Sequence, residues 1–378
     1  MSLPNIKISG YYGMRNYGDD LFAILSLRAM EKYFNVNNCS ILSPPIIKSN
    51  YKLNYSNIKS FNSERYLESS MYGKIYRFLN YLHATFNTDY MIFSGGSLFS
   101  NAGISNRDIL YKTNFSRYKF HALGVSVGPF KDKNAEEKIK EYLKKYEYIS
   151  LRDKKSYNIV KSYNLDAKVI LAGDIAGIGV EFLTSINKDN EKKVKKIKIG
   201  FSPCNILGDY ESSIKYIEHF VKNIIRIRKK IDFVVDILCL NENPYSGDKD
   251  LCKFVYERLN LNNIDCSIIN YGDIGIEGTW EKISTYDYYV SVRLHGAITA
   301  YLVDTDFFLY EYHEKCTEFL KLINKEISDP DCYEDNFYIE NHFFKKNLDK
   351  SSILEIKNYL NFSKENFLNS PLYNGVSK

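Results

Sequence analysis

Short apolar runs bounded by Gly, Pro or Asp alternate along the chain with longer segments of helical periodicity. Segment 19–33 illustrates the second kind, because its apolar residues recur every three or four positions and two acids open it. The predicted strands are residues 5–9, 90–93, 121–127, 149–151, 169–172, 197–201, 233–240, 267–270, 288–292 and 307–310. The predicted helices are residues 19–33, 71–86, 134–146, 211–230, 246–260, 279–286 and 295–302. This alternation favours an α/β fold in which helices cover both faces of parallel sheets.

The alternation falls into two series, which predict two doubly wound domains at residues 1–185 and 190–350. A C-terminal helix and tail, residues 351–378, are expected to pack back on the body. The lysine-rich stretch 191–198 reads as a solvated linker, and 43–70 as a long loop or insertion. Ligands of such sheets bind beyond the carboxyl ends of the strands, and two facing sheets would form a cleft there. The loops after the strands are therefore where we expect functional residues.

Composition narrows the class of protein. The chain has 378 residues, 44% of them hydrophobic, and a net charge of +5, which is too weakly basic for a dedicated nucleic-acid binder. Its seven cysteines include no CxxC pair or other metal-ligand spacing, so we expect free thiols and no metal site. The N-terminus lacks a signal-peptide pattern, and no apolar run approaches the ~20 residues that span a bilayer. These features predict a cytoplasmic protein.

Two glycine-containing loops follow predicted strands in the first half of the chain. The loop at 10–20 leads into a helix, where glycine permits close approach of a ligand and the helix N-terminus favours an anion. A purely structural turn, with Asn16 and Asp19 capping the helix, is at least as good an interpretation. The loop at 94–97 is open to the same two interpretations. The candidate residues in these loops are Gly13, Asn16, Asp19, Gly95, Gly96 and Ser97.

Cationic side chains follow three predicted strands. Arg152 comes directly after the strand at 149–151, with Asp153 beside it. Its guanidinium suits a carboxylate or phosphate, and an ordinary surface ion pair is the alternative. The stronger indication of a functional site lies in the second half of the chain, where several cationic side chains follow predicted strands. Cations clustered at a strand edge destabilise a fold unless an anion compensates their charge. The candidates there are Arg293, Leu294, His295, His313 and Lys315.

Six short motifs in fixed order give the sequence a resemblance to a known family. They run between residues 8 and 320 as Gly10-x-x-Gly13-x-x-Asn16-x-Gly18-Asp19, Gly95-Gly96-Ser97, Gly124-x-Ser126-x-Gly128-Pro129, Ser150-x-Arg152-Asp153-x-x-Ser156, Arg293-Leu294-His295-Gly296-Ala297 and Tyr312-His313-x-Lys315-Cys316. With them the chain resembles the polysaccharide pyruvyl transferases. The resemblance implies two facing Rossmann-like domains in a GT-B-like fold, with Arg152, Arg293 and His295 contacting phosphoenolpyruvate. One departure is Ile175 after Asp174, where the family commonly has a proline.

The resemblance also implies a reaction. A pyruvyl transferase moves the enolpyruvyl group of phosphoenolpyruvate onto a sugar of a surface polysaccharide or its lipid-linked precursor, forming a pyruvate ketal and releasing phosphate. Arg152, Arg293 and Lys315 would hold the donor's carboxylate and phosphate. His295 would protonate the methylene carbon, because imidazole titrates near neutral pH. No cofactor or metal is expected, since arginines can neutralise the phosphate.

Several alternatives stay open. Asp153, Asp174 and the departing phosphate are candidate acceptors of the hydroxyl proton. A GT-B glycosyltransferase with a nucleotide-sugar donor is a second candidate function, since Glu311 or Glu314 could imitate its ribose-binding acid, and a non-catalytic binder is a third. The expected partners are phosphoenolpyruvate and a saccharide acceptor, in one version linked to polyprenyl diphosphate, and no nucleic acid. A lipid-linked acceptor would bring the protein to the inner membrane face, where the loop 48–59 is either a contact or simply solvated.

Overall fold

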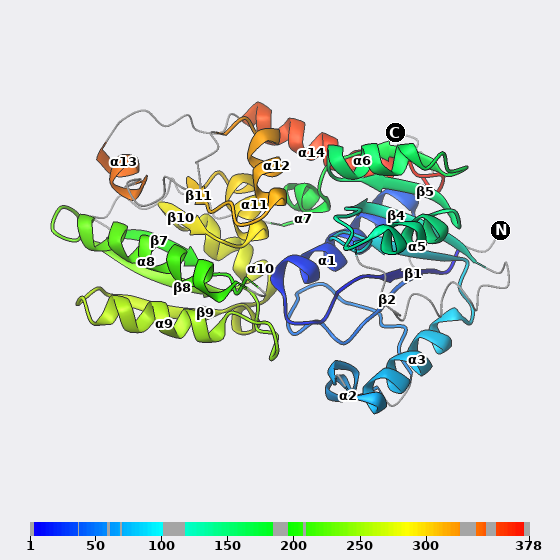
Figure 1. The fold of residues 1–378 in the computed structure, drawn as a ribbon, viewed down its shortest axis with the longest axis horizontal. Coiled ribbons are helices and arrows are strands. Elements are labelled where there is room, and N and C mark those ends of the chain that lie inside the picture. Colours follow the sequence, from blue (N-terminus) through cyan, green and yellow to red (C-terminus); the bar gives the residue numbers. More distant parts are fainter. Residues whose placement is uncertain are drawn as a thin grey trace. The chain divides into compact units, whose positions relative to one another are not determined.

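The computed structural model contains two compact units, each built on its own parallel sheet (Figure 1). The first unit comprises Met1–Met14, Asp19–Phe182 and Tyr359–Lys378, and the second comprises Arg15–Gly18 and Leu183–Asn358. The structure describes residues 4–36, 38–58, 61–68, 70–100, 118–183, 196–206, 209–325, 338–344 and 353–373. Most of the predicted linker lies outside these described residues.

The sheet of the first unit has six parallel strands in the order β2-β1-β3-β4-β5-β6. Their bounds are β1 Ile6–Ser9, β2 Cys39–Leu42, β3 Tyr90–Ser94, β4 Lys119–Val125, β5 Tyr146–Leu151 and β6 Lys168–Leu171. Register aligns Ile6 of β1 with Cys39 of β2 on one side and with Tyr90 of β3 on the other. Every residue of β1 is buried, as expected for a parallel strand covered on both faces.

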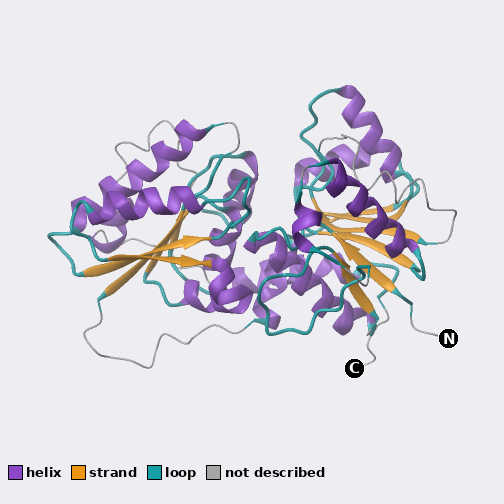
Figure 2. Ribbon diagram, turned by 90° about the horizontal axis from the view of Figure 1, so that it is seen from below, coloured by secondary structure: helices purple, strands orange, loops and turns teal. Residues whose placement is uncertain are grey.

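Helices connect and cover these strands (Figure 2). They are α1 Tyr17–Phe34, α2 Ser63–Leu67, α3 Met71–Thr85, α5 Lys133–Leu143, α6 Lys154–Ser162, η1 Ile175–Ile178 (a 3₁₀ helix), α7 Gly179–Phe182 and α14 Ile353–Leu368. The first two residues of α1 belong to the second unit, and the rest of that helix belongs to the first. The first six residues of α14 likewise belong to the second unit.

The sheet of the second unit has five parallel strands in the order β11-β10-β7-β8-β9. Their bounds are β7 Ile197–Ser202, β8 Phe233–Cys239, β9 Cys266–Asn270, β10 Tyr288–Ser291 and β11 Phe307–Leu309. The helices are α8 Tyr210–Ile227, α9 Lys249–Asn260, α10 Tyr271–Ser284, α11 Leu294–Leu302, α12 Glu314–Leu322 and α13 Tyr338–Phe344. Ile199 in the central strand β7 aligns with Val235 of β8 and Tyr288 of β10. The predicted α/β fold with two parallel sheets covered on both faces is confirmed (Figure 2).

The C-terminal helix α14 packs on the first unit, in agreement with the sequence-based prediction. The side-chain amide of Asn366 donates to the carbonyl of Gly173 at 2.8 Å, and its oxygen accepts from Ser150 Oγ at 2.7 Å. A methyl group on Gly177 would lie 2.0 Å from Ser363 Oγ, so glycine there permits the close approach of the helix. The helix therefore closes the first unit near the carboxyl ends of β5 and β6.

Some predicted boundaries were wrong. The helix predicted at 134–146 ends at Leu143, and Tyr146 already begins β5. The short helix predicted at 279–286 begins eight residues earlier, at Tyr271, because α10 continues through a kink at Gly275 with φ of 77°. Seven of the described elements were not predicted: β2, α2, α6, η1, α7, α12 and α13. Helix α2 lies in the segment 43–70 that was expected to be a loop or insertion.

Candidate functional site

The strand order of the second unit marks one edge of its sheet as the place for a ligand. Strand β7 lies between β8 and β10, so the sheet grows in one direction through β8 and β9 and then in the other through β10 and β11. In open parallel sheets, ligands bind beyond the carboxyl ends of the strands at such a reversal. The loops that leave β7 and β10 at this point carry Cys204, Asn205 and Arg293.

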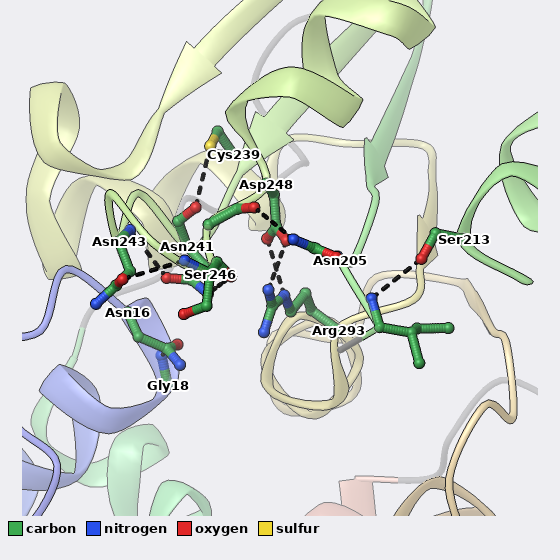
Figure 3. Close-up of polar contacts among 12 residues, drawn as sticks. Asn16, Gly18, Asn205, Ser213, Cys239, Asn241, Asn243, Ser246, Asp248 and Arg293 are labelled. Atoms are coloured by element: carbon green, nitrogen blue, oxygen red, sulfur yellow. Dashed lines mark hydrogen bonds and ion pairs between the residues drawn. The ribbon is translucent and has the colours of Figure 1, made fainter. Parts of the chain in front are cut away.

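Arg293 forms a two-point ion pair with Asp248 (Figure 3). Its Nε donates to Asp248 Oδ2 at 2.8 Å and its Nη2 to Oδ1 at 2.5 Å. The carboxylate is fully buried and also accepts from the backbone N–H of Asn205 at 2.8 Å. Burial works against the charge on Arg293, but the carboxylate outweighs that effect and raises the pKa of the guanidinium above its ordinary value. The guanidinium is thus a fixed, permanent cation, and its Nη1 takes no part in the pair with Asp248.

His295 lies against a segment from the N-terminal glycine-rich loop. A methyl group built on Gly18 would lie 2.1 Å from the Nδ1 of His295. The backbone N–H of Tyr17 donates to the carbonyl of Leu240 at 2.9 Å, and the Tyr17 hydroxyl lies 2.9 Å from Thr299 Oγ1. Two of the predicted motifs, one at each end of the chain, therefore meet at the imidazole.

Replacing Gly18 with alanine is expected to lower the free energy of unfolding by about 1–3 kcal/mol, because the methyl group forces the imidazole of His295 or the start of α1 to move. Urea unfolding measures the change. Gly278→Ala is the matched control, since its nearest neighbour, Ile274 Cβ, would be 3.1 Å away and the substitution favours the helix. Equal stability of the two variants would contradict the close contact.

The loop after β11 brings further groups to the same edge. His313 caps α12, its Nδ1 accepting from the backbone N–H of Lys315 at 3.2 Å. The Nζ of Lys315 lies 5.4 Å from the centre of the Tyr312 ring. Both Lys315 and Arg293 act electrostatically on Cys204, but burial dominates and raises the pKa of that thiol. Burial likewise raises the pKa of the Tyr312 hydroxyl. Thiol and phenol therefore stay neutral at pH 7 and do not repel an anion.

Arg152, in the first unit, is held by three side chains. Its Nε donates to Ser126 Oγ at 2.7 Å and its Nη2 to Ser97 Oγ at 3.2 Å. Its Nη1 lies 2.8 Å from Asp174 Oδ2, and its side chain is only 8% exposed. Its ion-pair partner is therefore Asp174 rather than the adjacent Asp153, and the interpretation as an ordinary surface pair is wrong. All three guanidinium nitrogens are engaged within this unit.

The two acids considered as proton acceptors both cap helices. Asp153 caps α6, accepting from the backbone N–H of Ser156 at 2.7 Å, and it also accepts from Ser126 Oγ at 2.7 Å. Asp174 caps η1, accepting from the backbone N–H of Ala176 at 2.9 Å, besides its pair with Arg152. Ile175, in the position of the family's proline, is the first residue of η1 and is fully buried.

Packing explains part of the glycine-rich loops. Gly13 has a φ of 68°, and a methyl group there would lie 2.1 Å from the carbonyl oxygen of Pro44. A methyl group on Gly95 would lie 2.4 Å from the ring of Phe22. Gly96 differs: its φ of 78° favours glycine, yet the nearest atom to a methyl group would be a carboxylate oxygen of Asp19 at 3.7 Å. Close packing therefore accounts for the glycines at Gly13 and Gly95.

Asn16 also has a structural role. Its side-chain oxygen accepts from the backbone N–H of Gly18 at 3.2 Å, which is a capping contact at the start of α1. Its backbone forms an antiparallel bridge with Asn241. Figure 3 shows Asn16 and Gly18 beside the loop that carries Asn241, Asn243 and Ser246. The capping interpretation therefore holds for Asn16 but not for Asp19, which is the third residue of α1.

Sequence reasoning missed Asp248, Asn205 and Ser126. Asp248 occupies the capping position of α9 but makes no side-chain capping bond, because its carboxylate pairs with Arg293 instead. The predicted helix 246–260 placed Asp248 in its first turn, where an acid is common, so the sequence offered no signal for the ion pair. Ser126 lies within a quoted motif, and its spacing alone did not indicate a contact with Arg152.

Two further properties bear on the kind of site. Among the residues that the structure describes, no three His, Cys, Asp or Glu side chains gather as a metal ion would require. None of the described helices combines the length and apolar character needed to cross a bilayer.

Comparison with solved structures identifies the fold. UDP-GlcNAc 2-epimerase from Neisseria meningitidis, bound to UDP-GlcNAc, is 13% identical with a TM-score of 0.55, covering 97% of this chain and 99% of that one. UDP-GlcNAc 2-epimerase from Methanocaldococcus jannaschii is 12% identical with a TM-score of 0.54, covering 92% and 94%. At such identities the likeness concerns the fold alone. A comparison with curated protein sequences gives no match.

Comparison with protein-family models identifies the family of the chain. The model described as polysaccharide pyruvyl transferase matches residues 16–314, a span that begins at the Asn16 cap and includes Arg152, Arg293 and His295. Because this span is well over half of the 378 residues, the chain belongs to the polysaccharide pyruvyl transferase family.

Proposed function

We propose that the chain transfers the enolpyruvyl group of phosphoenolpyruvate to a saccharide, releasing phosphate and forming a cyclic pyruvate ketal. Family membership supports a transferase of this kind. The observation that carries the proposal is the Arg293–Asp248 pair, which fixes a guanidinium at the reversal of the second sheet while leaving Nη1 out of the pair. A guanidinium edge suits a carboxylate or phosphate because it can donate two parallel hydrogen bonds.

Donor binding is assigned to the second unit. In the proposal, Arg293 holds one anionic group of phosphoenolpyruvate and Lys315 a second. Leu294 follows Arg293 at the start of α11 and is buried, so it helps to fix the loop. A contact of Arg152 with the donor stays a prediction, since its three nitrogens already donate to Ser126, Asp174 and Ser97.

The chemistry runs in balanced steps. His295 delivers a proton to the methylene carbon, and the neighbouring carbon becomes oxocarbenium-like. A sugar hydroxyl attacks that carbon and loses its proton. The bond to the phosphate oxygen then breaks with both electrons, and a second hydroxyl of the same sugar closes the ring and loses its proton. One hydroxyl proton restores His295 and the departing phosphate takes the other, so the chemistry as written uses no metal or cofactor.

A coupled assay tests the proposal. The protein is incubated with phosphoenolpyruvate and a panel of hexosides, free and linked to polyprenyl diphosphate, and phosphate release is followed together with the mass of the acceptor. We expect release that depends on both substrates and an acceptor that gains a pyruvyl group with loss of water. Omitting the acceptor is the control for simple hydrolysis.

The same assay separates the alternatives. Release of UDP from a UDP-sugar, without any requirement for phosphoenolpyruvate, would favour a nucleotide-sugar glycosyltransferase. A thermal shift with phosphoenolpyruvate that is lost in Arg293→Ala, but no turnover on any acceptor, would favour a binding protein. Arg152→Gln in the shift measurement tests the predicted contact of Arg152 with the donor.

A further inference from the structure

Helix α3 of the first unit exposes an unusual number of large apolar side chains. Of the 19 such side chains that are exposed among the described residues, six lie on α3 or directly after it. Tyr72 is 83% exposed and Met71 is 68% exposed. The six, called here the α3 face, are Met71, Tyr72, Ile75, Phe78, Leu79 and Phe86. In Figure 1 α3 lies at the edge of the first unit, beside α2 and away from the sheet.

The opposite side of α3 is anchored to the unit by polar contacts. The Asn80 side chain accepts from the backbone N–H of Ile58 at 3.0 Å. The Arg77 guanidinium donates to the carbonyl of Glu68 at 2.7 Å, and the buried Lys7 donates to the carbonyl of Ala84 at 2.6 Å. A surface helix usually turns its apolar stripe to the core. Here the buried residues are Gly73, Asn80, Tyr81 and Ala84, of which Tyr81 and Ala84 join the core. The α3 face lies on the other side of the helix and is not part of that core.

The α3 face is continuous. At 3.6 residues per turn, its five helical positions fall within an arc of about 120°. Lys74 borders one side of this arc and His83 borders the other, and both are exposed. A contiguous exposed apolar patch of this kind marks an interaction site on a soluble protein.

The surrounding charge indicates the chemistry of the partner. The exposed Lys74 borders the α3 face, and Arg77 is a second cation of the same helix. Helix α3 itself contains no acid. Cationic residues beside an apolar helical face complement a surface that combines hydrocarbon with negative charge. An anionic lipid bilayer is such a surface.

We propose that the α3 face inserts into the surface of an anionic membrane, with α3 lying in the plane of the interface. The 15 residues of α3 are too few to span a bilayer, and the helix fits the interfacial mode, in which the apolar arc enters the acyl boundary and Lys74 meets lipid phosphates. Tyr72 and Phe78 are residue types suited to this interface. The proposal does not depend on the reaction assigned above.

Vesicle flotation of the full chain tests this proposal. We expect wild-type protein to float with vesicles of phosphatidylcholine and phosphatidylglycerol, and to do so less at high salt. Ile75→Asp combined with Phe78→Asp should lower the ratio of bound to free protein about tenfold or more. Leu261→Asp is the matched control, because Leu261 is 77% exposed on the second unit and its replacement should leave flotation unchanged.

Three results would overturn the proposal. These are no flotation of the wild-type chain, unchanged flotation of the double variant, and a concentration-dependent dimer in light scattering that the double variant abolishes. The last would assign the α3 face to a second copy of the chain. Circular dichroism verifies that the double variant folds, and Lys74→Glu provides a second reduction of binding if it does not.

Discussion

Replacing His295 with glutamine is expected to lower the turnover of phosphoenolpyruvate by about 10²–10⁴-fold, because the amide cannot deliver a proton to the methylene carbon. Glutamine has a similar size and keeps a polar group beside Gly18, so the thermal shift caused by phosphoenolpyruvate should change little. Phosphate release under saturating donor and acceptor measures the turnover. A fall in kcat with a nearly constant donor KM would place the loss in the chemical step.

A second histidine provides the control for this experiment. His83 is exposed on α3, outside the candidate site, and His83→Gln should retain wild-type turnover on a water-soluble acceptor. If His295→Gln also turns over at the wild-type rate, the imidazole is not the acid, and the proton must come from another group.

Replacing Arg293 with alanine is expected to lower the free energy of unfolding by about 3–5 kcal/mol, because the fully buried Asp248 carboxylate loses its charged partner. Binding of phosphoenolpyruvate should be lost as well. Adding Asp248→Asn to Arg293→Ala should restore much of the stability, since the amide is uncharged and its oxygen can still accept from the backbone N–H of Asn205. Donor binding should not return in the double variant. Urea unfolding and calorimetric titration separate the two effects.

A second ion pair, closer to the surface, provides the comparison for the stability loss expected in Arg293→Ala. Arg226 pairs with Glu340 at the surface of the second unit, with 48% of the arginine side chain exposed. Arg226→Ala should change stability far less, because Glu340 keeps Lys230 as a second partner and the pair is partly exposed to water. A loss of the same size in both variants would mean that the burial of Asp248 is not what makes the Arg293 pair important.

The strands could be predicted from the sequence because parallel strands covered on both faces are continuous apolar runs. Segments 233–240 and 288–292 are close to this kind, with one polar residue each (Asp236 and Ser291), and they correspond to β8 and β10. Strand β2 was not predicted, since its four residues Cys39–Leu42 include Ser40 and look like loop. Helix α10 was predicted too short because Gly272, Gly275 and Gly278 weaken its helical pattern.

Only those site residues that directly follow a predicted strand could be identified from the sequence. Arg293 and His295 follow β10 directly, so their position at the sheet edge could be read from the sequence. Asp248 reaches Arg293 from the loop after another strand, and nothing local distinguishes it from a helix cap. The contact of Gly18 with His295 joins opposite ends of the chain. Such a contact depends on tertiary structure, which no local pattern encodes.

The assignment of Arg15–Gly18 to the second unit has a consequence for dividing the protein. A fragment that starts at Leu183 would carry the entire five-stranded sheet and still be incomplete. The carbonyl of Leu240 would lose the N–H of Tyr17, and the imidazole of His295 would lose the backbone beside it. A single cleavage of the chain therefore cannot separate the two units of this transferase intact. A fragment that starts at Leu183 would need a short N-terminal peptide, supplied in trans, to complete its second unit.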